Sequence, residues 1–420
     1  MRSTLVLALR SMRLRRFAVT LTVLTIALSV LLLLGVERLR HEARSSFANT
    51  VSGTDLIVGA RSGPVNLLLY SVFHVGDATS NVSWQSYREI AALPEVDWTV
   101  PISLGDSHRG FRVMGTSADF FRHYHYGDNH PLSFASGQPF NDLYDAVLGA
   151  QVAKRLYYRL GQRIVLAHGF GGGPEMLHAD KPFRVVGVLA PTGTPVDATV
   201  LVSLSGIEAI HVDWRSGMRL PGMEISAAQA RTMDLTPTSI TAFLVGLKSR
   251  LAAFAVERAV NDYTAEPLLA ILPGVALGEL WGLVGTAENA LRAVSAMVVL
   301  AGLCGMLTAL LTMLDQRRRE MAILRAVGAS ARTVFALLVI EAGLLAAAGA
   351  LLGVALLYIA LASLRGFVAA HYGLLLTLGP PTVEEWLLLA AVVTLGLLAG
   401  CIPAWIAYRR SLADGLQVRL

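Results

Sequence analysis

Four long apolar stretches alternate with more polar segments along the 420-residue chain. They cover residues 17–36, 293–314, 334–364 and 386–408. About 20 helical residues, each rising roughly 1.5 Å, cross the hydrocarbon of a bilayer, so each stretch predicts a transmembrane helix. The first stretch is too long for the apolar part of a cleaved signal peptide, and no A-x-A site follows it. We therefore expect a retained anchor.

The segment 37–292 has a different pattern. Patches such as "FRVVGVLA" at 183–190 predict strands, because β-branched and apolar residues dominate them. The stretch "AQVAKRLYYRL" at 150–160 predicts a helix that ends at Gly161. The mixture of the two patterns predicts an α+β domain that is large enough to bury its own core.

Polar helices are expected to continue the first two spans outward, over 37–48 and 277–292. They would connect the α+β domain to the membrane helices as stalks. The predicted fold class is therefore an integral membrane protein with four transmembrane α-helices and a large α+β extracytoplasmic domain inserted between helices 1 and 2.

Arginines gather on one side of the predicted membrane. The positions that flank the spans on that side are Arg2, Arg10, Arg13, Arg15, Arg16, Arg317, Arg318, Arg319, Arg325, Arg332, Arg409 and Arg410. The short loop 365–385, between spans three and four, offers only Arg365. Because positive residues stay cytoplasmic, we expect a basic amphipathic helix at 1–16, the 315–333 segment and the tail at 409–420 in the cytoplasm. Residues 37–292 would then lie outside the membrane, in a periplasm if there is one.

Composition agrees with this class. Hydrophobic residues make up 54% of the chain and charged residues 15%, whereas soluble proteins carry about a quarter charged residues. The net charge of +5 comes from arginines at the ends of the apolar stretches, which favours a membrane surface and excludes the basic stripe of a nucleic-acid-binding domain. The two cysteines, Cys304 and Cys401, both lie in apolar stretches, so no disulfide framework is expected.

The segment "DQRRREMAILRAVGAS" at 315–330 predicts a short charged helix, because residues 316–327 contain no Gly or Pro and Gly328 can terminate it. At 100° per residue, Ile323 and Val327 share a face that Leu324 and Met321 flank, whereas Arg318 and Arg325 lie opposite. Glu320 falls within the apolar arc. The residues leave two interpretations open: a surface that docks on a partner, or simple anchoring by positive charge.

Several stretches resemble FtsX-like ABC transporter permeases. "RRREMAILRAVGA" is similar to their cytoplasmic signature, and "VFALLVIEAGLLAAAGALLGVAL" is similar to their third helix. In the outer segment, "DAVLGAQVAKRLYYRLGQRIVL" and "FRVVGVLAPTGTPVDATVLVSL" resemble the periplasmic core of MacB-type members. The resemblance covers nearly the whole chain in order, with the permease domain at 293–410.

The resemblance implies a dimeric permease of the bacterial inner membrane, with residues 37–292 in the periplasm. The dimer would be made with a second copy or a paralogue and would couple to two copies of a separate cytoplasmic ABC ATPase. The resemblance also implies mechanotransmission, in which ATP hydrolysis by the partner moves the membrane helices and the periplasmic domain. The implied ATPase-coupling residues are Arg317, Arg318, Arg319, Glu320, Ile323, Leu324, Arg325, Val327 and Gly328. No G-x-x-x-x-G-K-[ST] loop occurs in the chain, so ATP and Mg²⁺ are expected in the partner, and this chain is expected to be neither an enzyme nor a cofactor-binding protein.

Three residues of the third span stand out. Glu341 is costly in lipid, so we expect it to face protein or the cytoplasmic interface, and the resemblance implies a structural or coupling role. Gly349 and Gly353 form a G-x-x-x-G spacing that permits close packing against another helix. Small residues tolerated in an Ala/Leu-rich span explain the spacing nearly as well.

The stretch "RHYHYGDNHP" at 122–131 is a candidate metal site, since His123, His125 and His130 with Asp128 supply ligands that suit zinc. Three histidines in a polar loop also arise by chance or for hydrogen bonding, and this interpretation is favoured. The glycine-rich "HGFGGGP" lacks the Lys of a phosphate-binding loop and predicts a hairpin tip. No catalytic arrangement stands out.

Three functions remain open. The leading one is the permease subunit of a MacB- or LolC/E-like transporter that acts on a periplasmic or membrane-extracted lipoprotein, peptide or hydrophobic compound. A second is a regulatory module that resembles FtsX itself and controls a periplasmic partner such as a cell-wall hydrolase. A third, suggested only by the histidines, is a membrane component of zinc homeostasis.

Overall fold

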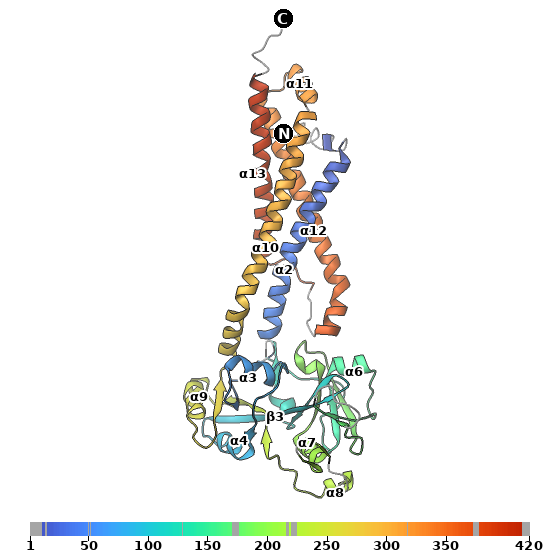
Figure 1. Cartoon of the computed structure of the whole chain (residues 1–420), viewed down its shortest axis with the longest axis vertical. Coiled ribbons are helices and arrows are strands. Elements are labelled where there is room, and N and C mark those ends of the chain that lie inside the picture. Colours follow the sequence, from blue (N-terminus) through green and yellow to red (C-terminus); the bar gives the residue numbers. More distant parts are fainter. Residues whose placement is uncertain are drawn as a thin grey trace. The chain divides into compact units, whose positions relative to one another are not determined.

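The structure is a computed structural model. It describes residues 11–12, 15–48, 50, 52–127, 129–169, 176–215, 218–219, 225–316, 318–372 and 378–413. The chain divides into two compact units. We call the first the helical unit; it consists of Met1–Glu42, Gly285–Gly366 and Leu376–Leu420. The second is the α/β unit, made of Ala43–Val284 and Phe367–Leu375. Both units are drawn in Figure 1.

The four predicted apolar helices are present and are longer than the apolar stretches. They are α2 (Arg16–Ala48), α10 (Pro273–Gln316), α12 (Ala331–Tyr372) and α13 (Val383–Ala413). Each contains a segment that is long and apolar enough to cross a membrane. The polar continuations predicted beyond the first two spans are helical, since α2 ends at Ala48 and α10 begins at Pro273. Both ends of the predicted 365–385 loop are also helical, because α12 reaches Tyr372 and α13 begins at Val383.

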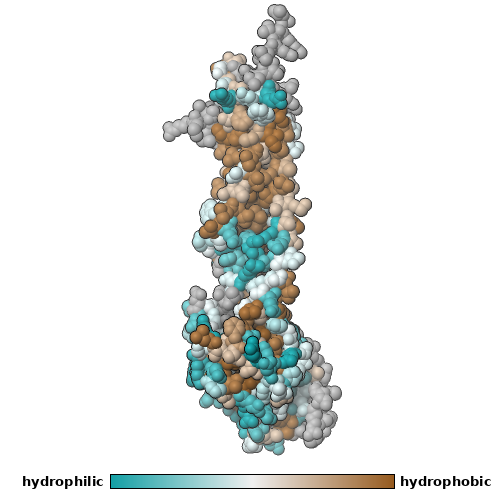
Figure 2. Space-filling model, turned by 90° about the vertical axis from the view of Figure 1, so that its left-hand side faces the viewer, coloured by the Kyte–Doolittle hydropathy of each residue, from teal (hydrophilic) through white to brown (hydrophobic). Residues whose placement is uncertain are grey.

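The helical unit has an apolar core of its own. Ile26 and Val30 of α2, Leu303 and Met306 of α10, and Leu345 of α12 are buried in one cluster. Figure 2 shows a continuous apolar band over the outside of these helices, with hydrophilic groups at both ends of the band. Helices that are apolar on the outside as well as in the core are typical of a bilayer environment.

The α/β unit is built on an eleven-stranded mixed sheet with the order β17-β1-β16-β3-β4-β12-β8-β11-β7; β10 pairs with β3, and β9 pairs with β11. The strands are β1 (Leu56–Ala60), β3 (Val96–His108), β4 (Phe111–Thr116), β7 (Phe134–Gly137), β8 (Asp145–Leu148), β9 (Arg163–Ile164), β10 (Ala167–His168), β11 (Phe183–Leu189), β12 (Thr199–Ser203), β16 (Ala242–Leu247) and β17 (Leu268–Ile271). The pairs β4–β12 and β8–β11 are parallel and the other pairs are antiparallel. The described residues also form three two-stranded sheets, β2–β15 (Val82–Ser83 and Ser239–Ile240), β5–β6 (His125–Tyr126 and His130–Pro131) and β13–β14 (Trp214–Arg215 and Met218–Arg219).

Helices cover this sheet, and they are α3 (Pro64–Ser71), α4 (Trp84–Ala91), α5 (Phe120–His123), α6 (Ala150–Leu156), α7 (Leu204–His211), α8 (Ala227–Ala230) and α9 (Ala253–Asn261). In Figure 1, α3, α4 and α9 lie at one end of the sheet, and α6, α7 and α8 lie at the other. Strand β1 is buried along its whole length, with Ile57 in one apolar cluster and Leu56 and Val58 in another. Since successive side chains point to opposite faces, both faces of the sheet are covered there. The predicted α+β class is confirmed.

The predicted end of the helix at 150–160 is wrong. Helix α6 ends at Leu156, and Tyr157 adopts a left-handed conformation with φ 56°. The Tyr158 N–H then donates to the Ala153 carbonyl, which closes the helix as a left-handed cap does. Gly161 also has a positive φ, of 84°, but it serves the turn that follows. A left-handed tyrosine carries no signal in a sequence pattern, whereas a glycine does.

Candidate functional site

The predicted charged helix is α11 (Arg318–Ala326). Met321 packs against the bundle, on a cluster that includes Leu314 and Val334. Ile323 and Val327 face outward instead, with 57% and 83% of their surface exposed. This arrangement leaves Ile323 on the outer face of a charged helix and Val327 just after the end of that helix, and both apolar side chains are exposed.

The turn after α11 has the predicted terminator. Gly328 adopts φ 97°, which glycine accepts without the cost that a Cβ imposes. The Ala329 N–H donates to the Leu324 carbonyl at 3.0 Å, and Ser330 then caps α12 by accepting from the Thr333 N–H at 3.2 Å. A glycine turn and an N-cap thus connect the end of α11 to the start of α12.

Glu320 makes an ion pair with Arg15, whose guanidinium lies 3.2 Å from its carboxylate. The charged helix therefore contacts the segment just before the first span, which the sequence pattern did not indicate. Arg317 lies outside the described residues, and so do the side chains of Arg318, Arg319 and Arg325. Most of the predicted N-terminal helix at 1–16 and the end of the tail, 414–420, are also outside them.

The predicted glycine pair of α12 packs against α2. A Cβ at Gly349 would lie 2.6 Å from the Cβ of Ile26, and a Cβ at Gly353 would lie 2.8 Å from the Ala27 carbonyl oxygen. No side chain fits at either position without moving α2. Glu341 is buried in the helical unit, as expected for a residue that faces protein; its role in coupling stays a prediction.

A cluster of charged residues joins α2, α10 and α13 in the helical unit. Arg38 is buried, with its guanidinium 3.4 Å from Glu385 and 3.5 Å from Glu42, and it donates to the Gly379 carbonyl at 3.0 Å. The further pairs of the cluster are Arg40–Glu37, Arg40–Glu288, Arg40–Glu384 and Arg292–Glu37. Sequence reasoning missed this cluster, because its members lie hundreds of residues apart.

The predicted metal ligands of the 122–131 loop do not converge among the described residues. The ring of His123 stacks on Trp98 with centroids 4.7 Å apart, and His125 Nδ1 lies 2.8 Å from the His123 carbonyl oxygen. His130 is exposed in β6, and Asp128 lies outside the described residues. The contacts that are present fit the alternative that these histidines serve stacking and hydrogen bonding.

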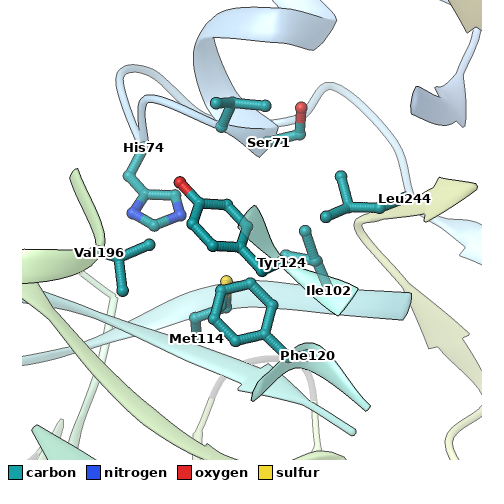
Figure 3. Close-up of a pocket in the computed structure, with 9 residues that line it drawn as sticks. Ser71, His74, Ile102, Met114, Phe120, Tyr124, Val196 and Leu244 are labelled. Carbon is teal, nitrogen blue, oxygen red and sulfur yellow. The ribbon is translucent and has the colours of Figure 1, made fainter. Parts of the chain in front are cut away.

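A small cavity in the α/β unit lies between α3 and the sheet. Figure 3 shows His74, Met114, Phe120 and Tyr124 around it. Its volume is about 10 Å³, which is the least space that holds one water molecule. Burial lowers the pKa of His74 to about 4, so the imidazole is neutral there. The cavity is too small for a ligand larger than water.

Four other residues of the α/β unit do converge. They are Asp106 of β3, His168 of β10, His178, and His211 at the end of α7, and one ligand atom from each lies within 4.8 Å of those of the others. Antiparallel pairing places His168 directly opposite Asp106. Packing of α7 on the sheet adds His211, and the ring of Trp214 lies against all three imidazoles.

The protonation states of this group follow from its surroundings. Although burial raises the pKa of Asp106, the neighbouring His168 and His211 lower it to about 2, so the carboxylate is ionised. Burial lowers the pKa of His178 to about 4, so that imidazole is neutral. Burial also lowers the pKa of His211, but the adjacent Asp106 outweighs it and raises that pKa.

No spacing rule could have found this group, because its members lie between residues 106 and 211 on different elements. His168 is the first residue of the glycine-rich "HGFGGGP", and residues 170–174 of that stretch lie outside the described part of the chain. The pairing of β3 with β10 is the feature that could have indicated this group. That pairing can be recognised only when the register of the two strands is known.

Two protein-family models match the chain. The MacB-like periplasmic core domain matches residues 19–263, and the FtsX-like permease C-terminal domain matches residues 292–414. A macrolide export ATP-binding/permease protein, MacB, of Azoarcus sp. (strain BH72) is 24% identical over 366 residues, which are 83% of this chain and 50% of that protein. The chain thus spans about half the length of this relative.

Two solved structures are similar to part of the chain. One is the periplasmic region of MacB from Actinobacillus actinomycetemcomitans, at 10% identity and a TM-score of 0.33, covering 55% of this chain and 94% of that one. The other is the extracellular domain of the noncanonic ABC-type transporter YknZ from Gram-positive bacteria, at 12% identity and a TM-score of 0.30, covering 52% of this chain and 99% of that one.

Proposed function

The chain belongs to the FtsX-like ABC transporter permeases that carry a MacB-like periplasmic core domain, and we propose that it is the membrane subunit of a transporter whose ATPase is a separate polypeptide. Two ATPase copies would bind and hydrolyse ATP with Mg²⁺. Two permease chains, identical or paralogous, would convert that cycle into motion of the periplasmic domains. The work would act on a periplasmic or membrane-extracted lipoprotein, peptide or hydrophobic compound.

The outer face of α11 is the observation that carries this proposal. Ile323 and Val327 are exposed there, although an apolar residue on a charged helix is normally turned to the core. Burying each in a groove of an ATPase would contribute roughly 1.5 to 3 kcal/mol. Glu320 would fix the register of docking from the same arc of the helix, with Arg15 holding its carboxylate.

Replacing Ile323 or Val327 with aspartate is expected to release the ATPase while the permease stays inserted. A charge in place of either apolar side chain would be desolvated on docking, and each 1.4 kcal/mol lost weakens binding about tenfold. The measurement is the amount of ATPase that co-purifies with the tagged chain in mild detergent, identified by its phosphate-binding loop, with ATP hydrolysis measured alongside.

Ser330→Asp is the matched control. It adds the same charge three residues after Val327 and seven after Ile323, and aspartate keeps the N-cap that Ser330 supplies. This variant should retain the ATPase. The proposal would be rejected if both Ile323→Asp and Val327→Asp retained the ATPase at normal yield. In that case α11 would serve only to anchor the chain by its positive charge.

Cysteine labelling tests the proposed orientation. In a background with Cys304 and Cys401 replaced by alanine, we expect Thr264→Cys, which is exposed in the α/β unit, to react with a membrane-impermeant maleimide from outside the inner membrane. Ser330→Cys, also exposed, should react only after the membrane is opened. Equal reaction of both from outside would contradict the orientation.

A further inference from the structure

We propose that Asp106, His168, His178 and His211 form a zinc-binding site in the α/β unit. The inference does not depend on the transport cycle, because it rests on the geometry and burial of these four side chains alone. Three imidazoles and a carboxylate are ligands that Zn²⁺ takes readily in proteins. An oxygen-rich set would be needed for Ca²⁺ or Mg²⁺.

The spacing of three of the ligand atoms matches a tetrahedral ion. His168 Nδ1 lies 3.0 Å from His211 Nε2. Asp106 Oδ1 lies 3.4 Å from each of these two nitrogens. In a tetrahedron with metal–ligand bonds of about 2.0 to 2.1 Å, neighbouring ligand atoms are about 3.3 to 3.4 Å apart. A zinc ion therefore fits this triangle with no large movement of the three side chains.

His178 supplies the fourth corner. Its ligand atom is within 4.8 Å of the other three, so a modest shift of its ring completes the tetrahedron. Only 1% of its surface is exposed, and neither ring nitrogen has a hydrogen-bond partner. A buried imidazole without any partner loses its hydration and gains nothing in return. A metal ion is the partner that this side chain lacks.

Asp106 has the same deficit. It is 3% exposed, and its Oδ1, although close to two imidazoles, makes no hydrogen bond. Buried polar atoms nearly always have a hydrogen-bond partner in native proteins. Here two of the four side chains, His178 and Asp106, have buried atoms without one. One zinc ion would satisfy both at once and would balance the charge of the carboxylate.

The imidazole of His211 is already oriented for a metal. Its Nδ1 donates to the Ile207 carbonyl, 2.9 Å away, so Nε2 is left to act as a ligand. A second-shell hydrogen bond of this kind fixes the tautomer and the ring plane of metal-binding histidines. Trp214, with its ring centroid 4.5 Å from that of His178 and 5.2 Å from that of His168, limits how these two rings can turn.

An ion can reach the site from one side. The side chains of His168 and His211 are 35% and 24% exposed, whereas Asp106 and His178 are buried. Four protein ligands complete the coordination of zinc, which is the arrangement of a structural site rather than of a catalytic one. The ion would tie β3, β10 and the end of α7 to His178.

Zinc binding by the full-length chain in detergent tests the proposal. We expect the protein to bind about one Zn²⁺ after chelator treatment and readdition of ZnCl₂, measured by elemental analysis and calorimetry, and we expect zinc to raise its Tm. His168→Ala and His211→Ala should bind zinc at least about tenfold more weakly. Their Tm without metal should stay close to that of the parent, which shows that they fold.

Two further measurements keep the outcome decisive. Replacing His123, His125 and His130 together by alanine is the matched control, and it should bind zinc as the parent does. Co²⁺ added in place of Zn²⁺ should give the intense visible absorption of tetrahedral cobalt in the parent, which reports the coordination without any variant. No zinc binding by the parent, unchanged binding by His168→Ala and His211→Ala, or loss of binding in the triple variant would overturn the proposal. Because none of these readouts involves an ATPase, failure here is distinct from failure of the proposed function.

Discussion

Replacing Arg38 with alanine is expected to lower the free energy of unfolding of the helical unit by about 3 to 5 kcal/mol, the usual cost of removing one partner from a buried ion pair. The variant would leave the carboxylates of Glu385 and Glu42 buried without their guanidinium. It would also remove the hydrogen bond from Arg38 to the Gly379 carbonyl, which would keep only its hydrogen bond from the Tyr358 hydroxyl. The loss can be measured by SDS titration of the purified protein in mixed micelles.

Arg292→Ala is the matched control for this variant. Arg292 pairs with Glu37 at 3.2 Å, but its side chain is nearly half exposed and Glu37 keeps Arg40 as a partner. Exposed ion pairs contribute about 0 to 1 kcal/mol, so this variant should lie close to the parent. The double variant Arg38→Ala with Glu385→Ala should lose less than the sum of the single variants. Additive losses would show that the two charges do not stabilise one another.

Replacing Gly353 with leucine is expected to destabilise the packing of α12 on α2 by about 1 to 3 kcal/mol or more, as overpacking of a close contact does. The new Cβ would meet the Ala27 carbonyl oxygen and the Val30 Cβ, both 2.8 Å away. Neither atom can move without the backbone of α2. Thermal denaturation in detergent, followed by size-exclusion chromatography, should show a clearly lower Tm.

Gly305→Leu gives the comparison on another helix. A Cβ at Gly305 of α10 meets nothing within 4 Å, so leucine there should leave the Tm nearly unchanged. If both variants behaved like the parent, the glycine spacing of α12 would reflect small residues tolerated in a span, which is the alternative that the sequence left open.

The four spans could be predicted because each is a long apolar run with charged flanks, and such runs have one physical solution in a bilayer. The ends of the helices were less accessible. The polar pattern of residues 37–48 did predict that α2 continues beyond its apolar part, but the left-handed cap at Tyr157 ends α6 where no glycine marks it. Local backbone conformation of this kind depends on tertiary contacts more than on residue type.

The clusters of histidine and charged side chains were hard to predict for a related reason. The sequence suggested a metal site only at histidines that are close in sequence, such as His123 and His125. The structure instead gathers His168, His178 and His211 around Asp106. Their convergence depends on the register of β3 with β10 and on the packing of α7, both of which are long-range. The same holds for Arg38 and Glu385, whose separation along the chain hides their contact.

The spread of the four proposed ligands along the chain also has a consequence for biogenesis. Asp106 emerges first and His211 last, and the ligands meet only after β3, β10 and α7 have folded together. An unfolded chain holds no such site, so a segment exported before it folds cannot carry zinc out from the cytoplasm. The zinc ion would bind after the domain has folded, in the compartment where folding takes place. The fraction of protein molecules that carry zinc would then depend on the concentration of free zinc in that compartment.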